Sequence, residues 1–192
     1  MVLQERKRLL FFIVLFAVTL LNSCSTEKNT ATRRFYHNLV SRYNIYYNGK
    51  ETMIQAMSQL EQNHKDDYAE IISILQYGSE KDLESIIPLM ERVSEKGSKI
   101  VLKHSMKFDG VEYNNWVKDA YLMIGKSRFF KHEYYSAIEM FDFIANNFNE
   151  NQIRLDALLW KAKSNLYLGK YKECNDVLST LESEMKKADV SV

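Results

Sequence analysis

The side chains with the greatest capacity for chemistry in this 192-residue chain are two cysteines and four histidines. The histidines are His37, His64, His104 and His132; they are widely spaced, and none has a second histidine or a cysteine at a spacing that places both on one helix face. A zinc site needs several such ligands that converge on one point. We therefore expect four solvated histidines and no bound metal.

The sequence carries no motif for catalysis. No glycine-rich phosphate loop occurs, and no serine lies in the turn that exposes a nucleophile. Cys174 takes the place of a small core residue in a helical repeat described below, so we expect a buried, inert thiol. These features argue against an enzyme and imply no cofactor.

Cys24 has a different context, because it follows the pattern of a secretory signal. Three basic residues near the start precede the apolar residues 9–21, a run too short to span a bilayer as a helix. The next residues, Leu21-Asn22-Ser23-Cys24, resemble a lipobox. We expect residues 1–23 to be a lipoprotein signal peptide, Cys24 to be lipidated, and residues 24–34 to be a tether. The alternative is a signal anchor in which Cys24 is a bystander thiol.

The charge balance excludes one class of partner. The formal net charge is +1 at pH 7, which provides no electrostatic surface for nucleic acid. If Cys24 carries lipid, Cys174 has no partner for an intrachain disulfide. The fold must then depend on packing alone.

From residue 35 onward the pattern is helical, with apolar residues recurring at intervals of three and four. One apolar face covers residues 35–46, Asn48-Gly49 interrupts it, and a second stripe covers residues 53–60. This arrangement predicts a helical hairpin over residues 35–62, a degenerate repeat unit. We assign degenerate hairpins to residues 35–110 as a whole.

Three shorter segments complete that region. Residues 66–78 have ambiguous helical spacing. Because proline is tolerated mainly in the first turn of a helix, we expect a stable helix over residues 88–104, preceded by a turn. The following stretch, KFDGVEYNNW, predicts a loop with a turn at Asp109-Gly110.

Residues 111–188 carry the clearest signal, a tetratricopeptide-like pattern of bulky and small residues that occurs twice. The two copies cover about residues 118–151 and 155–188, and equivalent positions are 37 residues apart. We therefore predict an all-α solenoid of tetratricopeptide-like helical hairpins. The predicted repeat-packing residues are Tyr121, Ile124, Gly125, Tyr134, Ala137 and Phe141 in the first copy, and Leu158, Ala162, Gly169, Tyr171 and Cys174 in the second.

Five aromatic residues are candidates for contact with a protein partner. Tyr36, Tyr43 and Tyr47 belong to an aromatic cluster that either packs within the first hairpin or forms a partner surface. Trp116 is expected at the entry to the first repeat. Trp160 is expected near the concave face, where such solenoids usually bind peptides.

Two stretches resemble a known family more closely than the repeats alone do. Residues 24–51, CSTEKNTATRRFYHNLVSRYNIYYNGKE, and residues 100–141, which contain KHS and YNNW, are similar to the N-terminal part of the PorW/SprE lipoproteins. Those are tetratricopeptide proteins, much longer than this chain, of the type IX secretion and gliding motility machinery. The resemblance implies a non-catalytic outer-membrane lipoprotein that faces the periplasm and binds protein partners of that machinery.

Other functions remain open. The same repeats could serve a general envelope-assembly adaptor of the kind that supports outer-membrane protein insertion. The chain could also be a truncated copy without a function. An enzyme, or an accessory to cell-wall hydrolysis, would need a convergent polar site that the sequence does not indicate.

Overall fold

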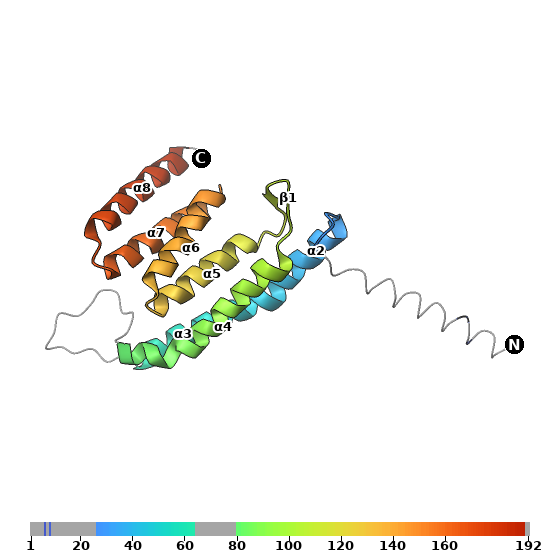
Figure 1. Cartoon of the computed structure of the whole chain (residues 1–192), viewed down its shortest axis with the longest axis horizontal. Coiled ribbons are helices and arrows are strands. Elements are labelled where there is room, and N and C mark those ends of the chain that lie inside the picture. The colour runs from blue at the N-terminus through green and yellow to red at the C-terminus, as the bar shows by residue number, and fades with distance from the viewer. Residues whose placement is uncertain (1–5, 7, 9–25, 64–79, 191–192) are drawn as a thin grey trace.

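The computed structural model describes residues 26–63 and 80–190, together with Arg6 and Arg8. In these ranges successive helices pack against one another in chain order, and Figure 1 shows the resulting stack from α2 to α8. The prediction of an all-α stack of helical hairpins is confirmed. The elements are α2 (Ala31–Val40), the π-helical segment η1 (Ser41–Tyr46), α3 (Tyr47–Asn63), α4 (Glu80–His104), β1 (Lys107–Phe108), β2 (Val111–Glu112), α5 (Val117–Phe130), α6 (Tyr134–Asn147), α7 (Asn151–Tyr167) and α8 (Tyr171–Val190).

One hydrophobic core runs through the stack from α3 to α7, and each helix contributes one apolar face. Its fully buried side chains include Ala56, Ile86, Met90, Phe129, Phe141, Ile144 and Ala157. Several predicted sequence features lie outside the described residues: Cys24, the ambiguous segment 66–78, and all of residues 1–23 except Arg6 and Arg8. Within the described ranges, no helix is both long and apolar enough to cross a membrane.

The predicted hairpin over residues 35–62 is wrong, because α2, η1 and α3 form one continuous helical segment from Ala31 to Asn63. Gly49 does not break this segment. It is buried where α3 approaches α5, and an added Cβ would lie 2.8 Å from the sulfur of Met123. Gly49 therefore lies at a close contact between helices, where a larger residue would displace the end of the Met123 side chain. The hairpin partner of this segment is α4.

The predicted helix start at Pro88 is also wrong. α4 begins at Glu80 and contains Pro88 in its interior. Leu83, Ile86 and Met90 are buried around the proline, so their burial holds the helix together through a residue that normally interrupts it. Here packing overrides local propensity.

The expected loop after α4 contains a small β-hairpin, while the turn at Asp109-Gly110 is found where the sequence places it. Both turn residues have positive φ, 50° and 82°, and β1 pairs antiparallel with β2. Glu112 fixes this hairpin to the end of α4: its Oε1 accepts hydrogen bonds from the backbone N–H groups of Met106 and Asn114, each at 2.8 Å. The hairpin thus joins the two halves of the stack.

Most of the residues predicted to pack the repeats are buried, from Ile124 and Gly125 in α5 to Cys174 in α8. The buried set is Ile124, Gly125, Ala137, Phe141, Leu158, Ala162 and Cys174, and Tyr121 and Tyr134 are half-buried. Gly125 allows the closest approach, since a Cβ there would lie 2.5 Å from the ring of Phe141.

Two of those assignments need correction. Tyr171 is 67% exposed at the start of α8 and does not pack the repeat. Gly169 has no atom within 4 Å of an added Cβ, and its φ of +71° shows that it is needed for a left-handed turn. His132, 37 residues earlier, adopts the same conformation with φ 60°. The repeat therefore extends to the backbone of the turn.

Candidate protein-binding groove

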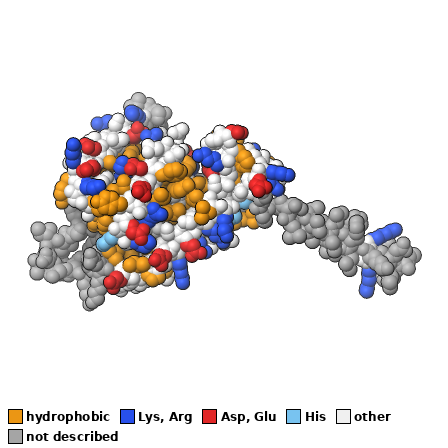
Figure 2. Space-filling model, viewed as in Figure 1, with side chains coloured by type: hydrophobic (Ala, Val, Ile, Leu, Met, Phe, Trp, Pro, Cys, Tyr) orange, Lys and Arg blue, Asp and Glu red, His pale blue; other side chains and the backbone are white. Residues whose placement is uncertain are grey.

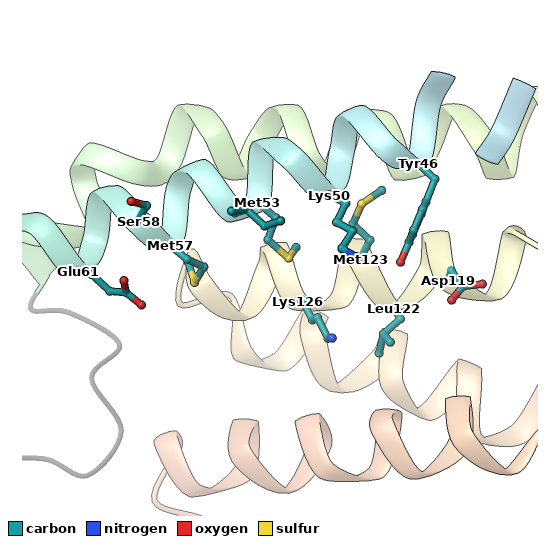
Figure 3. Close-up of a pocket in the computed structure, with 11 residues that line it drawn as sticks. Tyr46, Lys50, Met53, Met57, Ser58, Glu61, Asp119, Leu122, Met123 and Lys126 are labelled. Atoms are coloured by element: carbon teal, nitrogen blue, oxygen red, sulfur yellow. The ribbon is translucent and has the colours of Figure 1, made fainter. Parts of the chain in front are cut away.

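An open groove lies between α5 and the continuous segment α2–η1–α3, which we call the first helical segment. It has a volume of about 410 Å³, and its lining residues include Met53, Met57, Leu122 and Met123. Figure 3 shows Met53, Met57 and Met123 in the space between α3 and α5. Methionine side chains are flexible and polarizable, so they adapt to apolar groups of different shapes. The groove is suited to apolar side chains of a partner.

Charged side chains lie at defined places in this apolar groove. Figure 3 shows Glu61 at one end, Tyr46 and Asp119 at the other, and Lys50 and Lys126 between them. Burial raises the pKa of Asp119 above its usual value, and burial lowers the pKa of Lys126. Both charged groups are thus partly removed from water. In this less polar environment an opposite charge on a partner interacts with them more strongly than at an open surface.

The second repeat continues this pattern along the stack. Asp119 and Lys126 of α5 correspond, at the same interval of 37 residues, to Asp156 and Lys163 of α7. Trp160 lies next to both lysines, with Lys126 Nζ 5.1 Å and Lys163 Nζ 4.4 Å from its ring centroid. A pair of ammonium groups beside one aromatic ring favours a carboxylate-bearing ligand.

The repeat interval could have identified these residues from sequence. Our alignment used the packing positions and left out the aspartates and lysines between them. Asp119 and Lys126 occupy one face of α5 at a spacing of seven residues, and α7 repeats that spacing. Charged residues that recur with the structural repeat indicate a surface that the repeat presents.

The predicted partner residues are not brought together at this groove. Only Trp160 lies beside it, through Lys126. Trp116 is half-buried against Tyr46, with ring centroids 5.0 Å apart, and Tyr36 is half-buried with its ring edge toward His37. Tyr43 and Tyr47 are 61% and 56% exposed, so of the two alternatives for these tyrosines the packed face is wrong.

The expectation of solvated histidines is wrong for His37 and His104. Both are buried, and their Nδ1 atoms are 2.9 Å apart, which joins α2 to the end of α4. Beside them Asn114 Nδ2 donates to Ser41 Oγ and to the carbonyl of His104. Burial lowers the pKa of both imidazoles, that of His104 to about 4.

The burial of His37 follows from its place in the first helical segment. His37 begins a series of buried residues at intervals of four, followed by Ser41, Ile45 and Gly49. Its position in that series places His37 on the face toward α4. The partner, His104, is 67 residues away, and no local pattern connects the two. Nowhere in the described ranges do three His, Cys, Asp or Glu side chains lie close enough together to hold a metal ion.

The remaining surface is mixed in character. Figure 2 shows acidic and basic side chains interspersed over the visible face, with hydrophobic patches between them. No protein-family model matches the chain, and the search of curated proteins finds no match.

Proposed function

We propose that this chain is a lipid-anchored, non-catalytic scaffold that binds a protein partner in the groove between α3 and α5. The methionine-lined groove is the observation that carries the proposal, since it combines an apolar lining with the half-buried charges of Asp119 and Lys126 on α5. Such a lining accepts apolar anchor residues of a partner with little demand on their shape. The partner segment would place an apolar side chain between Met57 and Met123.

The charges suggest how the partner is oriented. Lys126 lies between the groove and Trp160 and has lost part of its hydration. Asp156 and Asp119 already attract the Lys126 ammonium. A carboxylate of the partner at this position would add a further attraction to Lys126 and would also lie near Lys163. The preferred ligand is thus a peptide segment with an apolar anchor followed by an acidic residue.

The resemblance to the PorW/SprE lipoproteins supports a more specific role for this scaffold. On that reading the helical stack is tetratricopeptide-like, Cys24 carries the lipid, and the protein faces the periplasm at the outer membrane. It binds components of the type IX secretion and gliding machinery. The anchor would raise the local concentration of those components beside the membrane.

The test is a gentle-detergent pull-down from native envelopes that compares the wild type with Lys126→Glu. Charge reversal at Lys126 should reduce recovery of specific partners about tenfold, since a half-buried attraction becomes a repulsion. Lys172→Glu is the matched control, because Lys172 is exposed on α8, and it should leave recovery unchanged.

The identity of the recovered proteins decides between the candidate roles. Type IX components that depend on Lys126 support the secretion scaffold. Outer-membrane insertion factors in their place would favour the envelope-assembly adaptor. If neither group is recovered, the scaffold proposal is wrong.

A further inference from the structure

The first helical segment exposes an apolar stripe on the side away from the core. Phe35, Leu39, Tyr43 and Tyr47 follow one another at intervals of four, with exposed fractions of 67%, 43%, 61% and 56%. Residues four apart on a helix lie on the same side. These large side chains form one continuous stripe along the segment, which we call the aromatic stripe.

The π-helical segment explains why the stripe is continuous. In a regular α-helix each step of four residues drifts by about 40° around the axis, so a four-residue series soon leaves its face. The wider turns of η1, Ser41–Tyr46, offset this drift. The buried series from His37 to Gly49 therefore stays toward α4, and the aromatic stripe stays toward solvent.

The charged residues within the sequence span of the stripe are basic, and Glu27 and Glu51 border that span. From residue 28 to residue 50 the chain has no aspartate and no glutamate. It has five basic residues in the same span, which are Lys28, Arg33, Arg34, Arg42 and Lys50. Arg42 lies directly beside the stripe, with its guanidinium 4.8 Å from the ring centroid of Tyr43. A helix that combines exposed aromatic residues with basic residues is suited to the interface of an anionic membrane.

The position of the stripe in the chain also favours contact with a membrane. Only residues 25–30 separate Cys24 from the start of α2, and six residues reach about 20 Å at full extension. A lipid on Cys24 would hold Phe35 close to the bilayer surface. The tyrosines of the stripe are residues that prefer the headgroup region.

We infer that the aromatic stripe of α2–η1–α3 lies on the surface of an anionic membrane. This inference rests on the anchor at Cys24 in the proposed function. The contact holds the first helical segment along the bilayer, so the anchor and the stripe together determine how the stack is oriented. The groove between α3 and α5 then has a defined direction relative to the membrane.

Vesicle flotation tests the stripe without the lipid. The protein used begins at residue 24 and carries Cys24→Ser, since the described fold lies within residues 26–190. It is mixed with vesicles of phosphatidylcholine alone or of equimolar phosphatidylcholine and phosphatidylglycerol. We expect binding to the mixed vesicles only, and weaker binding at high salt because salt screens the basic residues.

The decisive variant is Phe35→Ser/Tyr43→Ser, which should lower partition to mixed vesicles about tenfold or more, since it removes two aromatic side chains from the interface. The matched control is Tyr135→Ser/Tyr171→Ser, because those residues are 63% and 67% exposed on α6 and α8. The control should bind as the wild type does. Arg42→Glu should also weaken binding, and Lys172→Glu should not.

Three results would overturn the inference: no flotation of the wild type, equal loss in both double variants, or a dimer that only Phe35→Ser/Tyr43→Ser converts to monomers. The last result would make the stripe an interface between copies of this chain. Thermal unfolding followed by circular dichroism verifies that each variant is folded. A failed flotation with Cys24-dependent membrane retention in cells would remove this inference and leave the proposed anchor intact.

Discussion

At the scale of single residues, the contact between His37 and His104 is the feature with the clearest chemical consequence. Two neutral imidazoles whose Nδ1 atoms are 2.9 Å apart form a hydrogen bond only if one donates and the other accepts. Protonation of either imidazole would place a positive charge in a buried site. Arg33 lies near His37, and Lys99 and Lys103 lie near His104. All three cations oppose protonation.

This arrangement predicts that acid destabilises the fold. The pKa of His104 is about 4 in the folded chain, below its usual 6.5, mainly because of burial. As pH falls from 6.5 toward 4, the unfolded chain binds a proton that the folded chain does not. The contribution to stability is complete above pH 6.5 and is lost below pH 4, a change of about 3 kcal/mol at most. Urea unfolding at pH 7.5 and pH 5 measures the difference.

His104→Gln is expected to reduce this pH dependence, since glutamine does not titrate. His132→Asn is the control: His132 is exposed in a left-handed turn, and asparagine tolerates that conformation. It should preserve the pH dependence of the wild type. An identical dependence in His104→Gln would show that the histidine pair is not its source.

Gly125 allows a second prediction at the residue scale. Alanine normally favours a helix over glycine by about 1 kcal/mol, but here its Cβ would lie 2.5 Å from the Phe141 ring. Gly125→Ala should therefore destabilise the fold by about 1–3 kcal/mol. In a double-mutant cycle with Phe141→Leu, the second change should relieve part of that cost. Additive effects of the two changes would place the strain elsewhere.

At the scale of elements, α4 shows how far packing can override local preference. Pro88 has no N–H group for the carbonyl of Glu84, and its ring crowds that carbonyl. One turn away, the carbonyl of Ser85 accepts a hydrogen bond from Gln59 of α3 at 3.2 Å. The proline thus lies where α4 is held by its neighbour, and the buried face of α4 keeps the helix intact.

Pro88→Ala should stabilise the protein, because it restores one helical hydrogen bond and removes the clash. We expect about 1–3 kcal/mol, observed as a rise in the urea midpoint. Glu95→Ala, an exposed position in α4, should change stability by less than about 0.5 kcal/mol. A loss of stability in Pro88→Ala would mean that the backbone geometry that Pro88 imposes on α4 is needed for contact with α3.

The elements also show where sequence patterns were ambiguous. Asn48-Gly49 predicted a turn, because this pair is common where φ is positive. The chain uses Gly49 for its lack of a side chain, opposite Met123, and Asn48 donates a hydrogen bond to the carbonyl of Asn44 within the helix. The pair Asn48-Gly49 suits both a turn and a close contact between helices. Only the position of α5 distinguishes them.

At the scale of the whole molecule, the proposed anchor and the aromatic stripe act together. The lipid on Cys24 would keep the protein at the membrane, and the stripe would set its orientation. The groove lies between α3 and α5, and α3 continues the helical segment that carries the stripe. A partner in the groove would therefore be held close to the bilayer.

The anchor predicts a simple change in location. Cys24→Ser should move the protein from the membrane fraction to the soluble fraction of the envelope, because several acyl chains provide stable attachment and the stripe alone binds reversibly. Cys174→Ser is the control, since Cys174 is buried in the last hairpin, and it should remain with membranes. Fractionation followed by immunoblotting measures both, and full membrane retention of Cys24→Ser would remove the anchor from the proposal.

The sequence by itself determined the helical class and the turn at Asp109-Gly110, because each depends on residues close together in the chain. It also determined the interval of 37 residues, because the same local pattern occurs twice. Helix periodicity and turn chemistry are local properties. The same information identified Gly125 and Ala137 as small residues in a repeat, and both are buried.

Only the tertiary structure decided the role of Gly49, the burial of His37 with His104, and the groove between α3 and α5. Each depends on contacts between segments far apart in the chain, such as the 67 residues between the two histidines. The exposure of the stripe from Phe35 to Tyr47 was equally undetermined, because an aromatic series at helical spacing fits a core and an interface alike. The π turns and the position of α4 decided which face became buried.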